Sequence, residues 1–528
     1  MRGLMLGLAV MACAAAQPVA ARSVKVEEVS IDQLQTMMSN GRASSVDITR
    51  AYLARIAAMD RKGPTLRSVI AINPEALAQA RASDAERRGG RVRGPLHGIP
   101  ILIKDNIETA DRMATTAGSL ALIDNVTGRD APVVAMLRRA GAVILGKTNL
   151  SEWANIRSTH SMSGWSAVGG LVRNPYGLDR TACGSSSGSG AAIAASFAAI
   201  AVGTETDGSV VCPSSVNGLV GFKPSIGLVS RTHVVPISHS QDTPGPMGRS
   251  VRDVALMLSA MVGSDPADPT TVKAAPRDYT AGLSTSALSG MRVGVIRPKS
   301  MSDTLSVRYD QALETLKAAG AVLVEVSVPE LKGLGEAEQT VLMTELKADL
   351  DAYLATTPPA VKTRTLDQVI VFNRAHAAEE MPFFAQELFE QAAKTRGLDD
   401  PAYLAARQQS LRLAGKEGVD AMLKAAGVQI LVEPTYDAAW LSDPIYGDQY
   451  SGPSASELPA VAGYPHLTVP MGLVRGMPVG LSFIATKDAD AVVLGAGYAY
   501  EQRAKARQVP RYLPQTDAGK GLDGRQAT

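Results

Sequence analysis

Two loops rich in glycine and serine, separated by a run of small apolar residues, most constrain the fold of this chain of 528 residues. The first loop reads Gly-Ser-Ser-Ser-Gly-Ser over residues 184–189, and the second reads Gly-Thr-Glu-Thr-Asp-Gly-Ser over residues 203–209. Residues 191–202 between them are rich in alanine and contain neither proline nor glycine. Because alanine is the best helix former, we expect a helix there that lies close to a sheet.

The two loops have the composition that a nucleophilic site needs. The first loop would lie at the N-terminus of the helix, where free backbone N–H groups favour negative charge. The second loop places Ser209 beside the N–H groups of Thr206, Asp207 and Gly208, and Gly208 has no side chain to cover them. A serine among free N–H groups can combine a nucleophile with an oxyanion hole.

Helical periodicity alternates with short apolar runs along most of the chain, and this alternation is typical of an α/β fold. We expect a single large domain with a mixed, mostly parallel, twisted sheet covered by helices on both faces. The expected helices are residues 30–59, 73–88, 130–139, 307–319 and most of 346–425, and the expected strands are residues 99–104, 142–145, 291–296, 321–326, 428–432, 467–470 and 479–484.

The N-terminus has the pattern of an export signal. Arg2 supplies positive charge, residues 4–11 form an apolar run too short to span a membrane, and small residues follow as far as Ala21. We expect cleavage after Ala21, with cleavage after Ala16 and lipoprotein processing before Cys13 as alternatives. The protein is therefore predicted to be periplasmic or secreted, with no stable membrane span.

These motifs resemble the amidase signature family. Both serine loops of that family are present without a gap, and Gly-Ile-Pro-Ile-Leu-Ile-Lys-Asp-Asn-Ile at residues 98–107 is similar to its lysine-bearing strand. The resemblance covers roughly residues 29–503 and is weaker between about 300 and 428. It implies that Ser209 is the nucleophile, Ser185 the bridging serine and Lys104 the base. The implied oxyanion hole consists of the backbone N–H groups of Thr206, Asp207, Gly208 and Ser209.

The resemblance also implies an activity, which is hydrolysis of carboxamide bonds through an acyl-enzyme with neither a cofactor nor a metal. Within the family, the loop from Gly203 to Ser209 and the export signal are most similar to bacterial peptide amidases, which remove the C-terminal amide of peptides. The alternative is an amidase of small aryl or aliphatic amides. Asp207 departs from the commoner family pattern, which has glycine there. The predicted organisation is a signal peptide over residues 1–21, an amidase domain over 22–514 and a flexible tail over 515–528.

Functions of two other classes fit parts of the same sequence. Residues 184–188 match the Gly-x-Ser-x-Gly elbow of α/β-hydrolases, which would make Ser186 the nucleophile of an esterase with His376 or His466 as its base. An exported binding protein could instead use the serine loops to hold an anionic ligand. Residues 141–148 match the spacing of a phosphate-binding P-loop, but their apolar interior predicts a buried strand.

The remaining candidates are cysteines, charged groups and tyrosines. A net charge of +2 provides no basic face for nucleic acid, so we expect no such partner. Cys183 and Cys212 lie beside the serine loops, and export would permit a disulfide, although we favour two packed thiols. Hydrogen-bonding support near the core is expected from Arg180, Asp242 and Arg249. A peptide groove would use residues 300–428 as a wall, with Tyr436, Tyr446 and Tyr450 lining it. Surface or packing roles are expected for His97, His160, His233 and His239.

Overall fold

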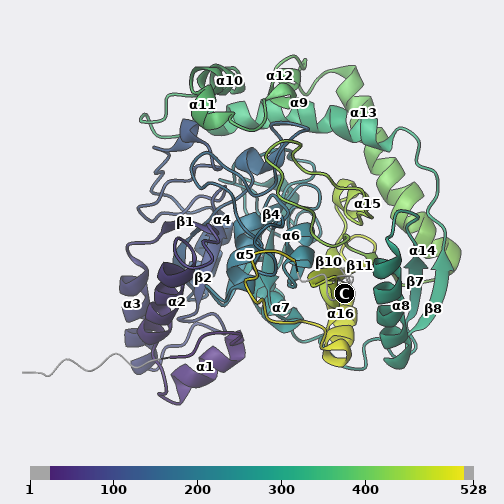
Figure 1. Cartoon of the computed structure of the whole chain (residues 1–528), viewed down its shortest axis with the longest axis horizontal. Coiled ribbons are helices and arrows are strands. Elements are labelled where there is room, and N and C mark those ends of the chain that lie inside the picture. The colour runs from purple at the N-terminus through teal and green to yellow at the C-terminus, as the bar shows by residue number, and fades with distance from the viewer. Residues whose placement is uncertain (1–23, 517–528) are drawn as a thin grey trace, which may run out of the picture.

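The structure is a computed structural model that describes residues 24–516 of the chain (Figure 1). The expected signal peptide, and the expected tail apart from Gln515 and Thr516, lie outside the described residues. The strands of the described residues form one sheet of eleven strands. In spatial order its strands are β1 (Val69–Ile72), β3 (Val143–Thr148), β2 (Pro100–Lys104), β4 (Ile200–Glu205), β6 (Thr243–Gly248), β5 (Val220–Lys223), β10 (His466–Val474), β11 (Met477–Ile484), β9 (Ile430–Pro434), β7 (Arg292–Ile296) and β8 (Val322–Val326).

The sheet is mixed, as expected, but it is not mostly parallel. Among the described strands, four pairings are parallel and six are antiparallel. The parallel pairings are β2–β3, β2–β4, β7–β8 and β7–β9, where a helix or a longer segment connects the strands. The centre is antiparallel, and β10 and β11 form a hairpin because Arg475 and Gly476 both adopt positive φ in the turn between them. The alternation of helices and strands along the chain therefore predicted parallel pairing correctly for only part of the sheet.

Helices cover the sheet in two groups, which places helices on both faces. Helices α5 and α6 contact each other and strands β2 to β6 and β10, whereas α4, α7, α16 and α8 contact one another in series and cover some of the same strands. The helices of the described chain are α1 (Ile31–Ser39), α2 (Ser45–Met59), α3 (Ala76–Arg88), α4 (Pro132–Arg139), α5 (Ser187–Ala194), α6 (Val211–Val216), α7 (Val251–Met261), α8 (Asp303–Ala318), α9 (Leu334–Ala355), α10 (Leu366–Ala375), α11 (Ala377–Glu380), α12 (Glu387–Ala392), α13 (Pro401–Leu411), α14 (Asp420–Ala426), α15 (Glu457–Val461) and α16 (Asp490–Ala504).

The small-residue segment is half helix and half strand, so the single helix expected over residues 191–202 is wrong. Helix α5 ends at Ala194, Ser196 adopts the left-handed conformation with φ of 56°, and β4 begins at Ile200. Small residues do allow close packing. A Cβ atom on Gly188 would lie 2.3 Å from the carbonyl oxygen of Ser68 and 2.4 Å from that of Asn149. A fully buried apolar run has no polar face, and its periodicity therefore cannot separate helix from strand.

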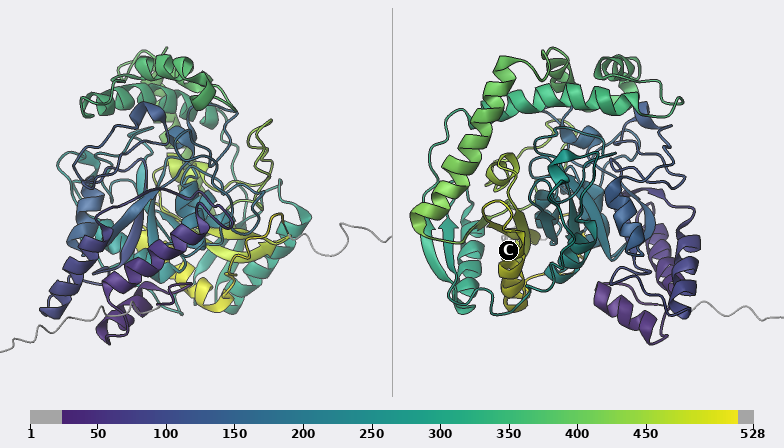
Figure 2. Two further views of the ribbon diagram at one scale, coloured as in Figure 1. Left: turned by 60° about the vertical axis from the view of Figure 1, so that its left-hand side comes forward. Right: turned by 180° about the vertical axis from the view of Figure 1, so that it is seen from behind.

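Residues 334–426 form an arch of helices over one side of the body. Figure 1 shows α9 to α13 as this arch, and Figure 2 shows the same helices above the sheet from two further directions. The expectation of a mostly helical segment over 346–425 is confirmed. No helix in residues 24–516 has the length and apolar character that a membrane crossing requires. Residues 143–148 form β3 and are all buried, which confirms the buried strand that was predicted in place of a P-loop.

Candidate active site

Lys104 lies at the point where two parallel strands end. It is the last residue of β2, which pairs with β4, and its side chain is fully buried. The Nζ atom donates hydrogen bonds to Ser185 Oγ at 2.7 Å and to Thr204 Oγ1 at 2.9 Å. Burial lowers the pKa of Lys104 to about 7, and the negative charges of Asp242 and Glu205 oppose only part of that shift. A lysine that is partly neutral near pH 7 can both accept and return a proton.

The two serine loops are joined to each other. The backbone N–H of Ser186 donates to the carbonyl oxygen of Ser209 at 3.2 Å. Cys183, before the first loop, forms a disulfide with Cys212, which is in α6, and their Cα atoms are 6.0 Å apart. The expectation of two packed thiols is therefore wrong. Sequence alone does not show that α5 and α6 lie side by side and bring the cysteines together.

The second loop turns sharply between β4 and α6. Gly208 has φ of 76°, and a Cβ atom there would lie 2.5 Å from the hydroxyl oxygen of Tyr436, so only glycine fits. Glu205 accepts hydrogen bonds from the N–H groups of Val210 and Val211 and holds the start of α6. Within residues 24–516, we find no acceptor in the protein for the backbone N–H groups of the four expected donors. These donors, available to a developing oxyanion, are Thr206, Asp207, Gly208 and Ser209.

Side chains from a neighbouring loop support Thr206. Its hydroxyl donates to Asp242 at 2.5 Å, and its carbonyl oxygen accepts a hydrogen bond from the side chain of Gln241 at 3.3 Å. Asp242 also accepts from the N–H groups of Ile237 and Ser238, at 2.8 and 3.0 Å. Burial raises the pKa of Asp242 to about 6 despite these bonds. The supporting role expected for Asp242 therefore has a specific target, which is Thr206, the first of the four expected oxyanion donors. We call residues 206–209 the oxyanion loop.

Asp207 interacts electrostatically with two carboxyl side chains that come from distant parts of the sequence. Desolvation raises the pKa of Asp207, while a hydrogen bond with Ser456 and the charge of Lys223 lower it. Burial, together with the charge of Asp207, raises the pKa of Glu338 to about 8. Burial, and after it the same charge, raises the pKa of Glu457. Glu338 and Glu457 come from α9 and α15, far along the chain, and no local motif marks either of them.

The expected groove residues are only partly together. Tyr436 lies against Gly208 and hydrogen bonds with Ser456 at 2.9 Å, and its ring centroid is 5.4 Å from that of Tyr450. Tyr446, in contrast, is 67% exposed. A cavity of about 1000 Å³ is lined by the start of α9 and by Ser454, Ala455, Glu457 and Leu458, on either side of Ser456 in the chain. Residues 296–300 and 325–336 line much of it, so part of the expected wall does border a cavity.

The alternative elbow does not assemble. Ser186 is fully buried, and its hydroxyl donates to the carbonyl oxygen of Thr204 and accepts from the Thr204 N–H. His466 pairs instead with the hydroxyl of Ser482 at 2.7 Å, and His376 with the carbonyl oxygen of Phe372 at 2.9 Å. The Ser186 hydroxyl thus hydrogen bonds with the backbone near the end of β4, and neither histidine is hydrogen bonded to Ser186.

Two arginines and three histidines have structural contacts or surface positions. Arg249 donates to the carbonyl oxygens of Ile193, Ala198 and Val29, and ties the N-terminal segment to the core as expected. Arg180 donates to the carbonyl oxygen of Ala439 at 3.4 Å. Of the histidines, His97 is buried and bonds to the Ser83 carbonyl oxygen, His233 is half-buried and His160 is exposed.

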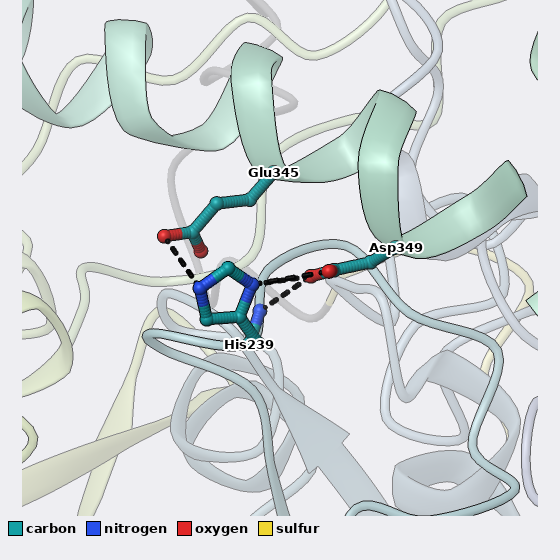
Figure 3. Close-up of side chains that lie close together, drawn as sticks. All are labelled: His239, Glu345 and Asp349. Carbon is teal, nitrogen blue, oxygen red and sulfur yellow. Dashed lines mark hydrogen bonds and ion pairs between the residues drawn. The ribbon is translucent and has the colours of Figure 1, made fainter. Parts of the chain in front are cut away.

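His239 is the remaining histidine of the expected set, and it lies between two carboxylates of α9 (Figure 3). Its Nδ1 atom is 2.9 and 3.0 Å from the two oxygens of Asp349, and its Nε2 atom is 3.3 Å from Glu345 Oε1. A metal ion would need both carboxylates on the side of one ring nitrogen. Here each nitrogen faces a different carboxylate, which suits a protonated imidazole donating from both nitrogens.

Lys104, Ser185 and the oxyanion loop together suit the hydrolysis of acyl compounds, and comparisons with known proteins define the class and the family. A model of the family described as Amidase matches residues 47–494. The protein is an amidase, a hydrolase of amide bonds. Because that match spans most of its length, the chain belongs to the amidase signature family.

Solved structures and curated proteins agree with this assignment. A native peptide amidase from Stenotrophomonas maltophilia is 50% identical, with a TM-score of 0.88 over 92% of this chain and 99% of that chain. A structure of the peptide amidase PAM with the competitive inhibitor chymostatin is also 50% identical, with a TM-score of 0.90 and the same coverage. A probable amidase of Arabidopsis thaliana is 35% identical over 92% of both chains. The predicted family and enzyme class are confirmed.

Proposed function

We propose that this amidase uses Ser209 as its nucleophile, Ser185 as a proton relay and Lys104 as its base. Neutral Lys104 takes the proton of Ser185 as Ser185 takes that of Ser209, whose Oγ attacks the amide carbon. The N–H groups of residues 206–209 stabilise the oxyanion. The proton then returns through Ser185 to the leaving nitrogen, and ammonia departs from an acyl-enzyme. Water attacks this ester by the same proton route and releases the carboxylic acid.

One observation carries this proposal, which is the 2.7 Å hydrogen bond between Lys104 Nζ and Ser185 Oγ in a fully buried setting. Burial there lowers the pKa of Lys104 to about 7, so a useful fraction of the lysine is neutral at physiological pH. The link between the serine loops supports the second proton transfer, because it keeps Ser185 and Ser209 on adjoining turns.

The substrates we propose are peptides that carry a C-terminal amide. Two structures named as peptide amidases are half identical to this chain over nearly their full length. The cavity lined by the start of α9, Ser454 and Glu457 is the space we propose for an extended acyl group, whereas an –NH₂ leaving group needs little space. The second candidate, an amidase of small aryl amides, is compatible with the same catalytic residues and differs only in the acyl side.

The test compares three compounds, which are a peptide amide, the same peptide as its free acid and a simple aryl amide. Ammonia released from the peptide amide alone, with internal peptide bonds intact, supports the proposal. Preference for the aryl amide with an inert peptide amide favours the second candidate. In parallel, fluorophosphonate labelling with peptide mapping should place the label on Ser209. A label on Ser186, or a folded protein that takes none, contradicts the triad.

We also propose that the protein is exported to the periplasm or secreted. The disulfide between Cys183 and Cys212 supports this proposal, because disulfides persist mainly in oxidising compartments. N-terminal sequencing of the mature protein tests it. A start at Arg22 supports cleavage after Ala21, and a start at Gln17 supports cleavage after Ala16. Full-length protein confined to the cytoplasm contradicts export.

A further inference from the structure

Residues 237–242, which we call the bridging segment, touch the oxyanion loop on one side and the helical arch on the other. Toward the oxyanion loop, Asp242 and Gln241 both bond to Thr206, one to its hydroxyl and one to its carbonyl oxygen. Toward the arch, Gln241 donates to Glu338 of α9 at 2.8 Å. The hydroxyl of Ser240 donates to Glu345 of α9 at 2.5 Å. The position of Thr206 therefore depends on how this segment is fastened to α9.

His239 makes the ionic part of that fastening. Its backbone N–H donates to Asp349 at 2.8 Å, and its Nδ1 atom bonds to the same carboxylate (Figure 3). Its Nε2 atom faces Glu345 at 3.3 Å. One histidine thus spans two carboxylates that lie one turn apart on the same helix, and it can donate to both only while its ring is protonated.

The groups around His239 favour the cation. From α9 it faces Glu345 and Asp349, and from α13 it faces the hydroxyl of Tyr403 at 3.5 Å. Arg407, also on α13, lies 4.0 Å from Glu345. Arg231 donates to the carbonyl oxygen of His239 and forms its own ion pair with Asp268. The hydrogen bond with Asp349 is the main cause of a raised pKa at His239, and burial and Arg231 oppose it.

We propose that His239 is a positioning residue for the amidase reaction, because its cationic ring locks the bridging segment to α9 and thereby holds Thr206 of the oxyanion loop in place. The inference rests on the proposed function in one respect, since it takes residues 206–209 as the oxyanion hole. His239 touches no reacting atom. His239 affects the position of Thr206 only through Asp242 and Gln241. A change at His239 should therefore alter kcat rather than substrate binding.

The sign of the pH effect follows from the ion pair. The raised pKa means that the lock is intact below the ordinary pKa of histidine, about 6.5, and is lost as the pH rises through the raised value. In contrast, Lys104 gains activity as it loses its proton near pH 7. The profile of kcat against pH should therefore rise with the neutral fraction of Lys104 and fall again as His239 becomes neutral.

The experiment measures kcat and KM against pH for Asp349→Asn and His239→Gln, with Glu390→Gln as the matched control. That control breaks the exposed ion pair between Arg374 of α10 and Glu390 of α12, on the same arch, and within the described part of the chain neither side chain bonds to residues 237–242. Displacing the oxyanion loop should lower kcat by about tenfold to a hundredfold with KM nearly unchanged. Asp349→Asn should move the alkaline limb to lower pH, His239→Gln should abolish that limb, and Glu390→Gln should change neither.

A wild-type kcat and an unshifted alkaline limb in Asp349→Asn would overturn the inference. Asp349→Asn retains the shape of the side chain, so it decides the matter even if His239→Gln does not fold. Fluorophosphonate labelling of the wild-type protein separates this test from that of the proposed function. A label on Ser209 with no effect of Asp349→Asn refutes only the positioning role. Absence of the label from Ser209 refutes the triad, whatever the variants do.

Discussion

Lys104 Nζ lies 2.7 Å from Ser185 Oγ, and nothing in the sequence except the family motif indicates that contact, since the two positions have a sequence separation of 81. Parallel pairing of β2 with β4 places the lysine at the carboxyl end of its strand. Ser185 lies in the turn that precedes α5, next to the N-cap residue Ser186. Lys104 is thus fully buried, and among the described residues its hydroxyl partners are Ser185 and Thr204.

Replacing Lys104 with alanine should abolish amide hydrolysis while the fold remains intact. Lys104→Arg is the matched control, because it keeps the charge but cannot lose its proton in this pH range, and it should be equally inactive. In the wild-type protein, kcat should rise with pH through about 7, where the lysine becomes neutral. Near-wild-type rates in Lys104→Ala, measured as ammonia release from a peptide amide, would contradict the mechanism.

The buried lysine should also reduce stability, and the sign can be stated. Its pKa is about 7 in the folded protein and about 10.4 when exposed. The folded state therefore binds the proton less tightly, so the stability penalty is full below pH 7 and shrinks as the pH rises toward the unfolded value. Lys104→Met should raise the melting temperature most at acidic pH, as thermal unfolding at several pH values would show. An equal gain at all pH values would contradict the lowered pKa.

The family motifs were enough to predict a set of catalytic residues, but not the residues that hydrogen bond with them. Lys104 and Ser209 each lie within a contiguous sequence motif that resembles one of the family's motifs. Glu338, Ser456 and Asp349 come from segments without such motifs, and only the tertiary fold brings them to the oxyanion loop or the bridging segment. Their positions depend on packing of the helical arch, which no local periodicity encodes.

Fold prediction failed where local patterns are ambiguous. The run from Ala191 to Val202 contains small and apolar residues throughout, so it fits a buried helix and a buried strand equally well. The hydroxyls and glycines of α5 gave no strong helix signal, yet they allow the helix to pack against the backbone at Ser68 and Asn149. The direction of the central strands could not be predicted from the sequence either. The order of strands along the chain does not reveal that β6 pairs with β4 in the antiparallel direction.

Gly208→Ala should lower both stability and activity. Its positive φ disfavours an L side chain by about 1–2 kcal/mol, and the added Cβ atom would lie 2.5 Å from the hydroxyl oxygen of Tyr436. We expect a lower melting temperature and a reduced kcat. Adding Tyr436→Phe removes the clashing oxygen and should restore part of the loss. If the double variant is no better than Gly208→Ala, the steric explanation is wrong.

The disulfide between Cys183 and Cys212 should contribute substantially to stability. It closes a loop with a sequence separation of 29 residues, and removing a crosslink of that size costs about 3–4 kcal/mol. Chemical denaturation of the double variant Cys183→Ser/Cys212→Ser, compared with the oxidised wild-type protein, measures the loss. The reduced wild-type protein serves as the control and should fall near the double variant. Equal midpoints for the oxidised protein and the double variant would contradict the prediction.

Ser185→Ala and Ser186→Ala form a matched pair that separates catalysis from structure. Ser185 bonds to Lys104, so its loss should cut kcat severely and change the melting temperature little; water at the vacated hydroxyl position could maintain a residual rate. Ser186 exchanges two hydrogen bonds with the backbone of Thr204 and is fully buried. Its loss should destabilise the protein by about 1–3 kcal/mol, because the buried N–H of Thr204 loses its acceptor, and should reduce kcat only modestly. The measurements are steady-state kinetics on a peptide amide and thermal unfolding of the same preparations. The reverse pattern, with Ser186→Ala inactive but stable and Ser185→Ala close to wild type in rate, would restore Ser186 as the nucleophile.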